Sequence, residues 1–308
     1  MTTSNGTDDE EPAMHGTTVV ITGASSGIGM YTAIGMAALG ATTVLACRDR
    51  GKAEAAAADV RAAATGGEVH VVDLDLADLP SVRACADELL ARFERIDVLI
   101  NNAGGIWSPR RVTRQGLEMT FGVNHLGHFA LTSLLAERLR ASSPSRVVTV
   151  SSVAHWFAPG GMRFDDLQSE GRYIGFDAYA RSKLANILFT RELARRLAGT
   201  GVTANAVHPG PVRSGFGMDG DLGGISGLAN HLMRPFEITP EAGARTSIHV
   251  AAAPELSTTT GGYFARSRPA RTAPAARDDG AATRLWDMSH RIAARAGLDL
   301  PDVTPDPH

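Results

Sequence analysis

The chain has little of several residue types, and each shortage excludes a class of protein. Only two cysteines, Cys47 and Cys85, occur in 308 residues, so no disulfide framework is available and both thiols fit a reducing compartment. The formal net charge of −3 supplies no basic field for nucleic acid or an anionic membrane. No run of about 18 apolar residues occurs, so we expect no membrane span. These shortages favour a cytoplasmic protein without a nucleic-acid partner.

The two ends of the chain differ from the rest in composition. The first fifteen residues are polar and acidic, without the basic and apolar regions of a signal peptide. We expect residues 1–15 to be a disordered tail and residues 299–308 to be a second tail. No linker interrupts residues 16–298, so the sequence predicts a single domain there.

Short β-branched runs alternate with longer helical stretches through this domain. We expect strands at 17–22, 42–47, 68–73, 97–101, 146–151 and 202–207, with a possible edge strand at 261–265. We expect helices at 27–39, 50–64, 79–94, 113–140, 178–198, 240–253 and about 280–296. Several strands are apolar on both faces, as when helices cover a parallel sheet on each side. The alternation predicts an α/β fold, a doubly wound (Rossmann) parallel sheet.

A glycine-rich stretch breaks this alternation. Residues 214–235 hold six glycines between a strand and a helix. Long loops in compact domains are usually functional or disordered. We interpret the stretch as a substrate lid, with a plain surface loop as the alternative.

Tyr179 and Lys183 stand four residues apart in a helical segment, so the phenol and the ammonium share one face. Such a pair is commonly a solvated surface feature. A cation near a phenol also favours the phenolate and so brings a weak acid within reach of proton chemistry. The spacing alone leaves both interpretations open.

The first strand runs directly into a glycine-rich turn, "TGASSGIG" at 22–29. Glycines at a strand-to-helix turn let the backbone approach a pyrophosphate at the positive end of the helix. The spacing is Gly-x-x-x-Gly-x-Gly rather than the commoner Gly-x-Gly-x-x-Gly. A tight turn needs glycine in any case, so the position after the first strand is the stronger signal.

Six motifs together resemble one family. "TGASSGIG", "NNAG" (101–104), "VNHLGHF" (123–129), "VSS" (150–152), "YARSK" (179–183) and "HPGPVRS" (208–214) follow the order and spacing of the short-chain dehydrogenases/reductases. The resemblance covers roughly residues 16 to 265. Within the family, "LACRDR", "DLQSE" and "SKLANILFTRELARRL" look most like the branch of the retinol dehydrogenases and WW-domain oxidoreductases.

The resemblance implies catalytic roles for four residues. Tyr179 would be the general acid/base, and Lys183 would lower the pKa of its phenol and hold the nicotinamide ribose. Ser152 would hydrogen-bond the reacting oxygen; its neighbour Ser151 is the alternative. Asn124 would hold a water that relays protons to Lys183, or would make a local bond to the backbone.

The resemblance also implies a set of cofactor-binding residues along the carboxyl ends of the strands. Asp75 would face the adenine, with Asp73 as the competing choice, while Asp78 caps the next helix and His208 is structural. The residues are Gly23, Ser25, Ser26, Gly27, Ile28, Gly29, Arg48, Asp75, Leu76, Asn102, Ala103, Gly104, Tyr179, Lys183, Pro209, Gly210, Val212 and Ser214.

The end of the second expected strand indicates which dinucleotide binds. A carboxylate at this place selects NAD, because it accepts from the ribose 2′-OH and repels a 2′-phosphate. Here Cys47 is neutral and Arg48 follows, with Lys52 four residues on. Arg48 can hold a phosphate through two parallel bonds, although Asp49 adjoins it. We therefore predict NADP.

The sequence thus predicts an NADP(H)-dependent oxidoreductase that interconverts a carbonyl and an alcohol on an apolar small molecule. Trp107, Trp156 and Phe157 would line its pocket. A silent NAD(P)-binding regulator or scaffold is the alternative, which the Ser–Tyr–Lys set disfavours. No metal-ligand spacing occurs, so we predict no catalytic metal. Relatives often pair through helices corresponding to 113–140 and 178–198, which makes a homodimer or tetramer plausible.

Overall fold

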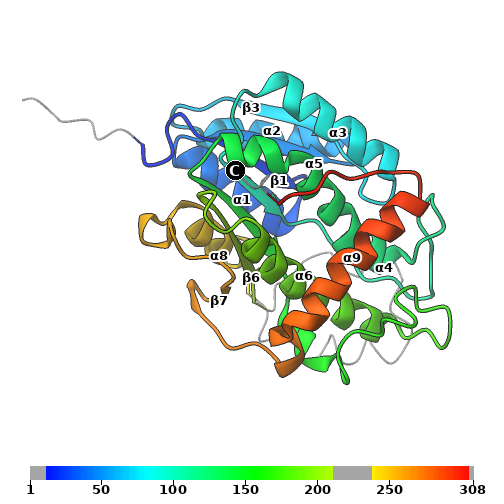
Figure 1. Cartoon of the computed structure of the whole chain (residues 1–308). Coiled ribbons are helices and arrows are strands. Elements are labelled where there is room, and N and C mark those ends of the chain that lie inside the picture. Colours follow the sequence, from blue (N-terminus) through cyan, green and yellow to red (C-terminus); the bar gives the residue numbers. More distant parts are fainter. Residues whose placement is uncertain (1–11, 211–237, 305–308) are drawn as a thin grey trace, which may run out of the picture.

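The centre of the molecule is one eight-stranded sheet (Figure 1). The computed structural model describes residues 12–210 and 238–304. The strands are β1 (Thr18–Thr22), β2 (Thr42–Cys47), β3 (Val69–Asp73), β4 (Val98–Asn101), β5 (Ser145–Val150), β6 (Val202–His208), β7 (Tyr263–Ala265) and β8 (Arg268–Pro269). Their order in the sheet is β3-β2-β1-β4-β5-β6-β7-β8, and all neighbours are parallel except β7 and β8. The chain winds outward in both directions from β1, which confirms the predicted doubly wound α/β fold.

Helices cover both faces of the sheet (Figure 1). One face carries α1 (Gly27–Ala38), α2 (Arg50–Ala63) and α8 (Pro240–Ala252). The other carries α3 (Leu79–Arg92), α5 (Gly127–Ala141) and α6 (Gly175–Arg196), and α9 (Asp279–Arg295) packs against α6. Short helical turns complete the chain: α4 (Met119–Phe121), η1 (Gly122–Leu126), η2 (Val153–Phe157), η4 (Pro254–Leu256) and η5 (Pro274–Arg277). Alternate strand residues enter opposite cores, because successive side chains of a strand point to opposite faces.

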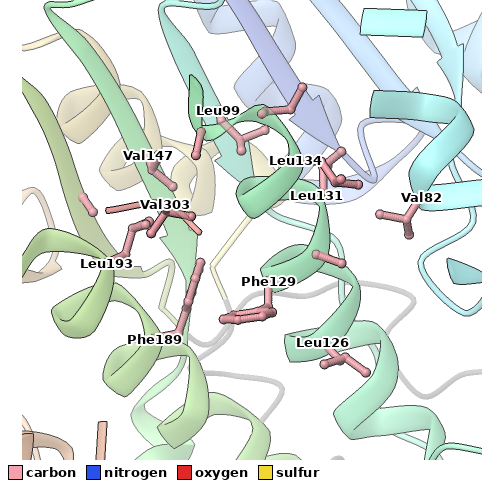
Figure 2. Packing of buried hydrophobic residues seen from close by; sticks show 14 of the residues in the cluster. Val82, Leu99, Leu126, Phe129, Leu131, Leu134, Val147, Phe189, Leu193 and Val303 are labelled. Carbon is pink, nitrogen blue, oxygen red and sulfur yellow. The ribbon is translucent and has the colours of Figure 1, made fainter. Parts of the chain in front are cut away.

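The larger core lies between the sheet and the layer of α3, α5 and α6. Figure 2 shows Phe129 of α5 facing Phe189 of α6, and their ring centroids are 5.7 Å apart. The C-terminal segment adds Val303 to this cluster, close to Val147 and Leu193 (Figure 2). Burial of these apolar side chains fixes α5 and α6 against the sheet.

Residues 12–15 and 299–304 pack against the domain, which we did not expect. Val303 is fully buried and its carbonyl accepts from Arg140, so the expectation of a C-terminal tail is wrong for residues up to 304. At the other end, Met14 is buried and its N–H donates to the Leu39 carbonyl at 2.8 Å. The domain therefore begins before residue 16. In both segments an apolar side chain fills a gap beside the main core, which composition did not reveal.

The helix that we expected at 113–140 begins six residues later. Gly116 adopts a φ of +77°, which turns the backbone out of helical geometry. Glu118 then caps α4, because its carboxylate accepts from the N–H groups of Thr120 and Phe121 at 2.8 and 2.7 Å. The segment before α4 is thus a turn, and Gln115 within it reaches across to the start of α3.

Three further expectations concern the edge of the sheet, a membrane span and the glycine-rich stretch. The strand that we expected at the edge, 261–265, appears as β7, but β8 pairs with its outer side and forms the edge. None of the helices in residues 12–210 and 238–304 is long and apolar enough to cross a bilayer. The stretch 214–235, which we interpreted as a lid, lies outside the described residues.

Candidate active site

The carboxyl ends of the parallel strands bring the sequence motifs to one edge of the sheet. The turn 22–29 follows β1, "NNAG" ends β4, Ser152 follows β5 and Pro209 follows β6. Helix α6 runs beside β5 and carries Tyr179 and Lys183. Open α/β sheets bind ligands at this edge, beside the point where the strand order reverses.

The glycine turn is built for close contact with another backbone. Gly23 has a φ of +66°, and a Cβ there would lie 2.8 Å from the Ala103 Cβ. A Cβ on Gly29 would lie 2.4 Å from the Asn102 amide nitrogen. Gly27 also has a positive φ, of +56°, but nothing lies within 4 Å of its Cβ position. Its open side lies at the start of α1, where N–H groups and the helix dipole favour an anion.

"NNAG" is tied directly to this turn. The Asn102 side chain donates to the Thr22 carbonyl at 2.8 Å, and the backbone N–H groups of Asn102 and Ala103 both donate to the Thr22 hydroxyl. Three hydrogen bonds therefore join the ends of β1 and β4. Such cross-links pre-organise this surface, which would lower the cost of binding a ligand that touches either strand end.

The two serines after β5 have different environments. Ser151 is fully buried, and its hydroxyl donates to the Lys183 carbonyl at 2.7 Å. Ser152 is only partly buried, and its hydroxyl accepts from Ala154 N–H at 3.1 Å. The backbone carbonyl of Ser152 is held by His155, whose Nδ1 lies 2.6 Å away. Ser152 is thus the serine placed next to the phenol of Tyr179.

The pKa of Tyr179 does not follow the sequence-based expectation. We expected Lys183 to lower the pKa of the phenol. Burial instead raises the pKa of Tyr179 to about 12, and the hydrogen bond from Ser152 opposes this rise only in part. The Lys183 ammonium lies 5.6 Å from the centre of the ring. Desolvation dominates this shift, so the phenol keeps its proton at neutral pH.

Lys183 is buried beneath the end of β5. Its Nζ donates to the Val150 carbonyl at 3.1 Å, and burial lowers the pKa of its ammonium to about 8. A Cβ on Gly104 would lie 3.3 Å from this Nζ and 3.1 Å from the Asn124 side-chain oxygen. Glycine at 104 therefore keeps the space between Lys183 and Asn124 open.

Asn124 lies in η1, a turn of π-helix between α4 and α5. Its side-chain oxygen accepts from Gly105 N–H at 2.8 Å, and its amide donates to the Gly105 carbonyl and to the Ser182 hydroxyl, both at 2.9 Å. Ser182 in turn donates to the Tyr179 carbonyl at 2.7 Å. Single π-turns occur frequently at functional sites, and this one connects Asn124 to the helix that carries Tyr179.

The adenosine end of the site differs in part from the expectation. Asp75 uses its carboxylate to accept from Ala77 N–H at 3.0 Å in the turn after β3. Leu76 is buried in the core, so its side chain packs inward rather than toward a ligand. Asp78 stands at the start of α3, but its carboxylate contacts Gln115 instead of capping the helix.

Arg48 lies beyond the end of β2, exposed and without an ion-pair partner among residues 12–210 and 238–304. Its acidic neighbour Asp49 caps α2 by accepting from Lys52 N–H at 3.0 Å, which lowers the pKa of its carboxyl. Asp73, the end of β3, pairs with Arg50 at 3.1 Å. Both nearby carboxylates therefore have other partners.

The residues at the end of β6, next to the end of β5, form another part of the site. Gly210 has a φ of +99° and donates its N–H to His208 Nδ1 at 3.4 Å. His208 also accepts from Val153 N–H, and burial lowers its pKa to about 4. Val212 and Ser214, which we expected to contact the cofactor, lie outside the described residues.

Comparison with known proteins shows the family. The family model for short-chain dehydrogenases matches residues 17–164 and 166–221. Human retinol dehydrogenase 14 is 48% identical over 290 residues, covering 90% of this chain and 86% of the relative. Human retinol dehydrogenase 12 is 49% identical over 274 residues, covering 89% and 85%.

Two solved structures resemble this chain in fold and sequence. An uncharacterised protein of Mycobacterium paratuberculosis has a TM-score of 0.75 and 39% identity, covering 95% of this chain and 97% of the other. A Beutenbergia cavernae protein named for NAD(P)-dependent gluconate 5-dehydrogenase activity, with NADP at low occupancy, has a TM-score of 0.66 and 29% identity, covering 83% and 97%.

The fold and the matches define an oxidoreductase with a nicotinamide cofactor, acting on a carbonyl/alcohol pair. The chain belongs to the short-chain dehydrogenase family, in the branch of the retinol dehydrogenases.

Two residues beside the site were not predicted from the sequence to have a role of their own. Thr22 was part of the motif "TGASSGIG" and His128 part of "VNHLGHF". His128 follows Asn124 by four residues, a spacing at which a side chain can bond a backbone carbonyl one turn back. This spacing was the one feature of the sequence that could have indicated the contact between His128 and Asn124.

Proposed function

We propose that this protein is an NADP(H)-dependent oxidoreductase that interconverts a carbonyl and an alcohol on an apolar small molecule, with Tyr179 as general acid/base. The observation that carries the proposal is the meeting of Ser152, Tyr179, Lys183 and Asn124 at the sheet edge that also holds the glycine turn. A protein that only binds a dinucleotide needs no proton donor there, which disfavours the silent regulator or scaffold.

The protonation states suit reduction of a carbonyl. A phenol with a pKa of about 12 is fully protonated at neutral pH and can give its proton to a developing alkoxide. Ser152, hydrogen-bonded to Tyr179, would hold the same oxygen. When bound, the nicotinamide supplies or accepts the hydride. For oxidation of an alcohol, the phenol must first lose its proton, and the Lys183 ammonium, 5.6 Å from the ring centre, would stabilise the phenolate that forms.

The glycine turn and Arg48 would hold the cofactor. The open side of Gly27 at the start of α1 suits a pyrophosphate. Gly23 and Gly29 lack side chains, which lets the turn pack closely against "NNAG". Arg48 supports NADP over NAD, because it is exposed while Asp49 and Asp73 are engaged elsewhere. Pro209, Gly210, Val212 and Ser214 remain proposed contacts of the nicotinamide end.

Apolar side chains beside the acid/base pair support an apolar substrate. Val153, Trp156 and Phe157 follow Ser152 and are about half exposed. Ile174 and Phe176 precede Tyr179, are also half exposed, and bring the Phe176 ring within 5.9 Å of Phe157. The relatives named retinol dehydrogenases suggest a retinoid-sized alcohol or aldehyde as the first substrate to test.

The test is Tyr179→Phe, compared with wild type on retinal and other apolar aldehydes. The variant should bind NADPH with nearly unchanged affinity, whereas kcat falls by roughly 10² or more because the proton donor is absent. Wild-type turnover in Tyr179→Phe would refute the mechanism. Absence of turnover on every carbonyl tried, with tight NADPH binding retained, would favour the regulatory alternative. The oligomeric state and the cytoplasmic location remain predictions.

A further inference from the structure

One buried hydroxyl joins the cofactor turn to the helix layer. Thr22 Oγ1 accepts from Asn102 N–H at 2.9 Å and from Ala103 N–H at 3.0 Å. The same oxygen lies 2.8 Å from Nε2 of His128, which belongs to α5 and stands 106 residues away along the chain. Thr22 and His128 are both buried.

The hydrogen-bonding capacity of Thr22 determines the tautomer of His128. A hydroxyl has one hydrogen and two lone pairs. The two backbone N–H groups use both lone pairs, so Thr22 must donate its own hydrogen. The Ile100 carbonyl is 3.4 Å away, whereas His128 Nε2 is 2.8 Å away. Nε2 is therefore the acceptor, and the ring proton is on Nδ1.

The other side of the ring completes a chain of hydrogen bonds. His128 Nδ1 lies 3.1 Å from the Asn124 carbonyl, and with its proton on Nδ1 the ring donates to that oxygen. Burial lowers the pKa of His128 to about 4, so the ring is neutral at physiological pH. A neutral ring can accept at Nε2 and donate at Nδ1 at the same time.

We propose that His128 is a positioning residue that couples the cofactor-binding turn to Asn124 through the chain Thr22–His128–Asn124. The chain begins at the N–H groups that connect β1 to β4 and ends on the backbone of the π-turn. The Asn124 side chain bonds Gly105 and Ser182, and His128 bonds the backbone carbonyl of the same residue. This inference rests on the proposed function for the role of Asn124.

The first test reads the tautomer directly. Nitrogen-detected NMR of protein labelled at histidine distinguishes a ring protonated at Nδ1 from one protonated at Nε2, and His128→Gln assigns the signal. We expect Nδ1 protonated and Nε2 bare, without any cofactor present. A ring protonated at Nε2, or one that carries both protons at neutral pH, would overturn the chain.

The second test separates positioning from stability. Thr22→Val keeps the shape of the side chain but removes the hydroxyl that joins His128 to the two N–H groups. It should weaken NADPH binding about tenfold, since it leaves these part-buried N–H groups unpaired. Thr22→Ser keeps the hydroxyl and should bind NADPH within about twofold of wild type. The matched control is Ser145→Ala, which removes the 2.7 Å hydrogen bond from buried Ser145 to the Leu139 carbonyl at the start of β5, the end of the strand opposite the site. It should lower thermal stability and leave the NADPH Kd unchanged.

A double substitution tests the coupling itself. His128→Leu should weaken NADPH binding in wild type but add little in the Thr22→Val background, because the chain is already broken. If the fold-changes in NADPH Kd of the two single variants multiply in the double variant, the coupling is refuted. A Thr22→Val variant that loses stability like Ser145→Ala but binds NADPH normally would also refute it.

Failure of this inference can be told apart from failure of the proposed function. If wild type binds neither NADPH nor NADH, the proposed function fails, and the NMR tautomer alone decides the hydrogen-bond chain. If Tyr179→Phe abolishes turnover while Thr22→Val leaves the NADPH Kd unchanged, the proposed function stands and the positioning role of His128 is wrong.

Discussion

Alanine substitutions at two adjacent serines should affect different properties, the stability of the fold in one variant and turnover in the other. Ser151 and Ser152 are neighbours in sequence, yet Ser151 is buried under the Lys183 carbonyl and Ser152 stands beside Tyr179. We expect Ser151→Ala to affect mainly the stability of the fold. We expect Ser152→Ala to affect mainly the chemical step.

The magnitudes follow from these contacts. Ser151 makes one buried hydrogen bond of 2.7 Å, and losing it should lower the free energy of unfolding by about 1 kcal/mol. In a domain of this size that corresponds to a fall in Tm of about 2 °C. Ser152 would donate to the reacting oxygen, and removing one such donor lowers kcat by roughly 10² to 10³. Its contact with Ala154 N–H is partly exposed, so the loss of stability should be smaller.

The assay measures kcat and KM for an aldehyde with NADPH, together with Tm, for both variants and wild type. Ser152→Thr serves as the control, since it keeps a hydroxyl at the same position. A large loss of kcat in Ser151→Ala with normal turnover in Ser152→Ala would refute the assignment of Ser152. Equal losses in both would show that the two serines act through the shape of this segment and not through one hydroxyl.

Three further predictions concern the cofactor, the core and acid stability. Wild type should prefer NADPH over NADH at least about tenfold in kcat/KM, equivalent to about 1.4 kcal/mol, and Arg48→Ala should remove most of that preference while NADH use changes little; full discrimination in the variant would contradict the role of Arg48. Phe129→Ala should lower the free energy of unfolding in urea by about 3 to 5 kcal/mol, because the ring is fully buried against Phe189; a loss below about 1 kcal/mol would contradict this packing. Burial lowers the pKa values of His125 and His208 from 6.5 to about 3 and about 4, so the unfolded state binds these protons first and stability should fall as the pH drops from about 6.5 toward 4. Urea titrations at several pH values should show that the free energy of unfolding falls by up to about 1.4 kcal/mol per pH unit for each of these histidines. The contribution of one histidine should be missing in His208→Gln, and a flat profile in wild type would contradict the prediction.

Local patterns in the sequence were sufficient for the order of elements. Strands β1 to β6 were predicted from short β-branched runs, and the single doubly wound domain from their alternation with helices. The spacing of Tyr179 and Lys183 on one helix and the glycines of the turn at 22–29 are also local features. Each depends on the geometry of a few consecutive residues, which is why no tertiary information was needed.

Local patterns were insufficient where a residue's role depends on distant neighbours. The start of the helix at α4 was misplaced because Gly116 and the Glu118 cap outweigh the helical periodicity around them. The C-terminal segment was taken for a tail because nothing within it shows that Val303 meets Val147 of β5 (Figure 2).

At the active site, the sequence by itself determined which chemical groups are available: a phenol, an ammonium, a hydroxyl and an amide at the ends of strands and on one helix. The tertiary structure decided their state. It partly buries Tyr179, so that desolvation raises the pKa of the phenol, and it brings His128 to Thr22 from 106 residues away. Burial and long-range contacts arise from the order of strands in the sheet, and the distance between two residues along the chain says little about either.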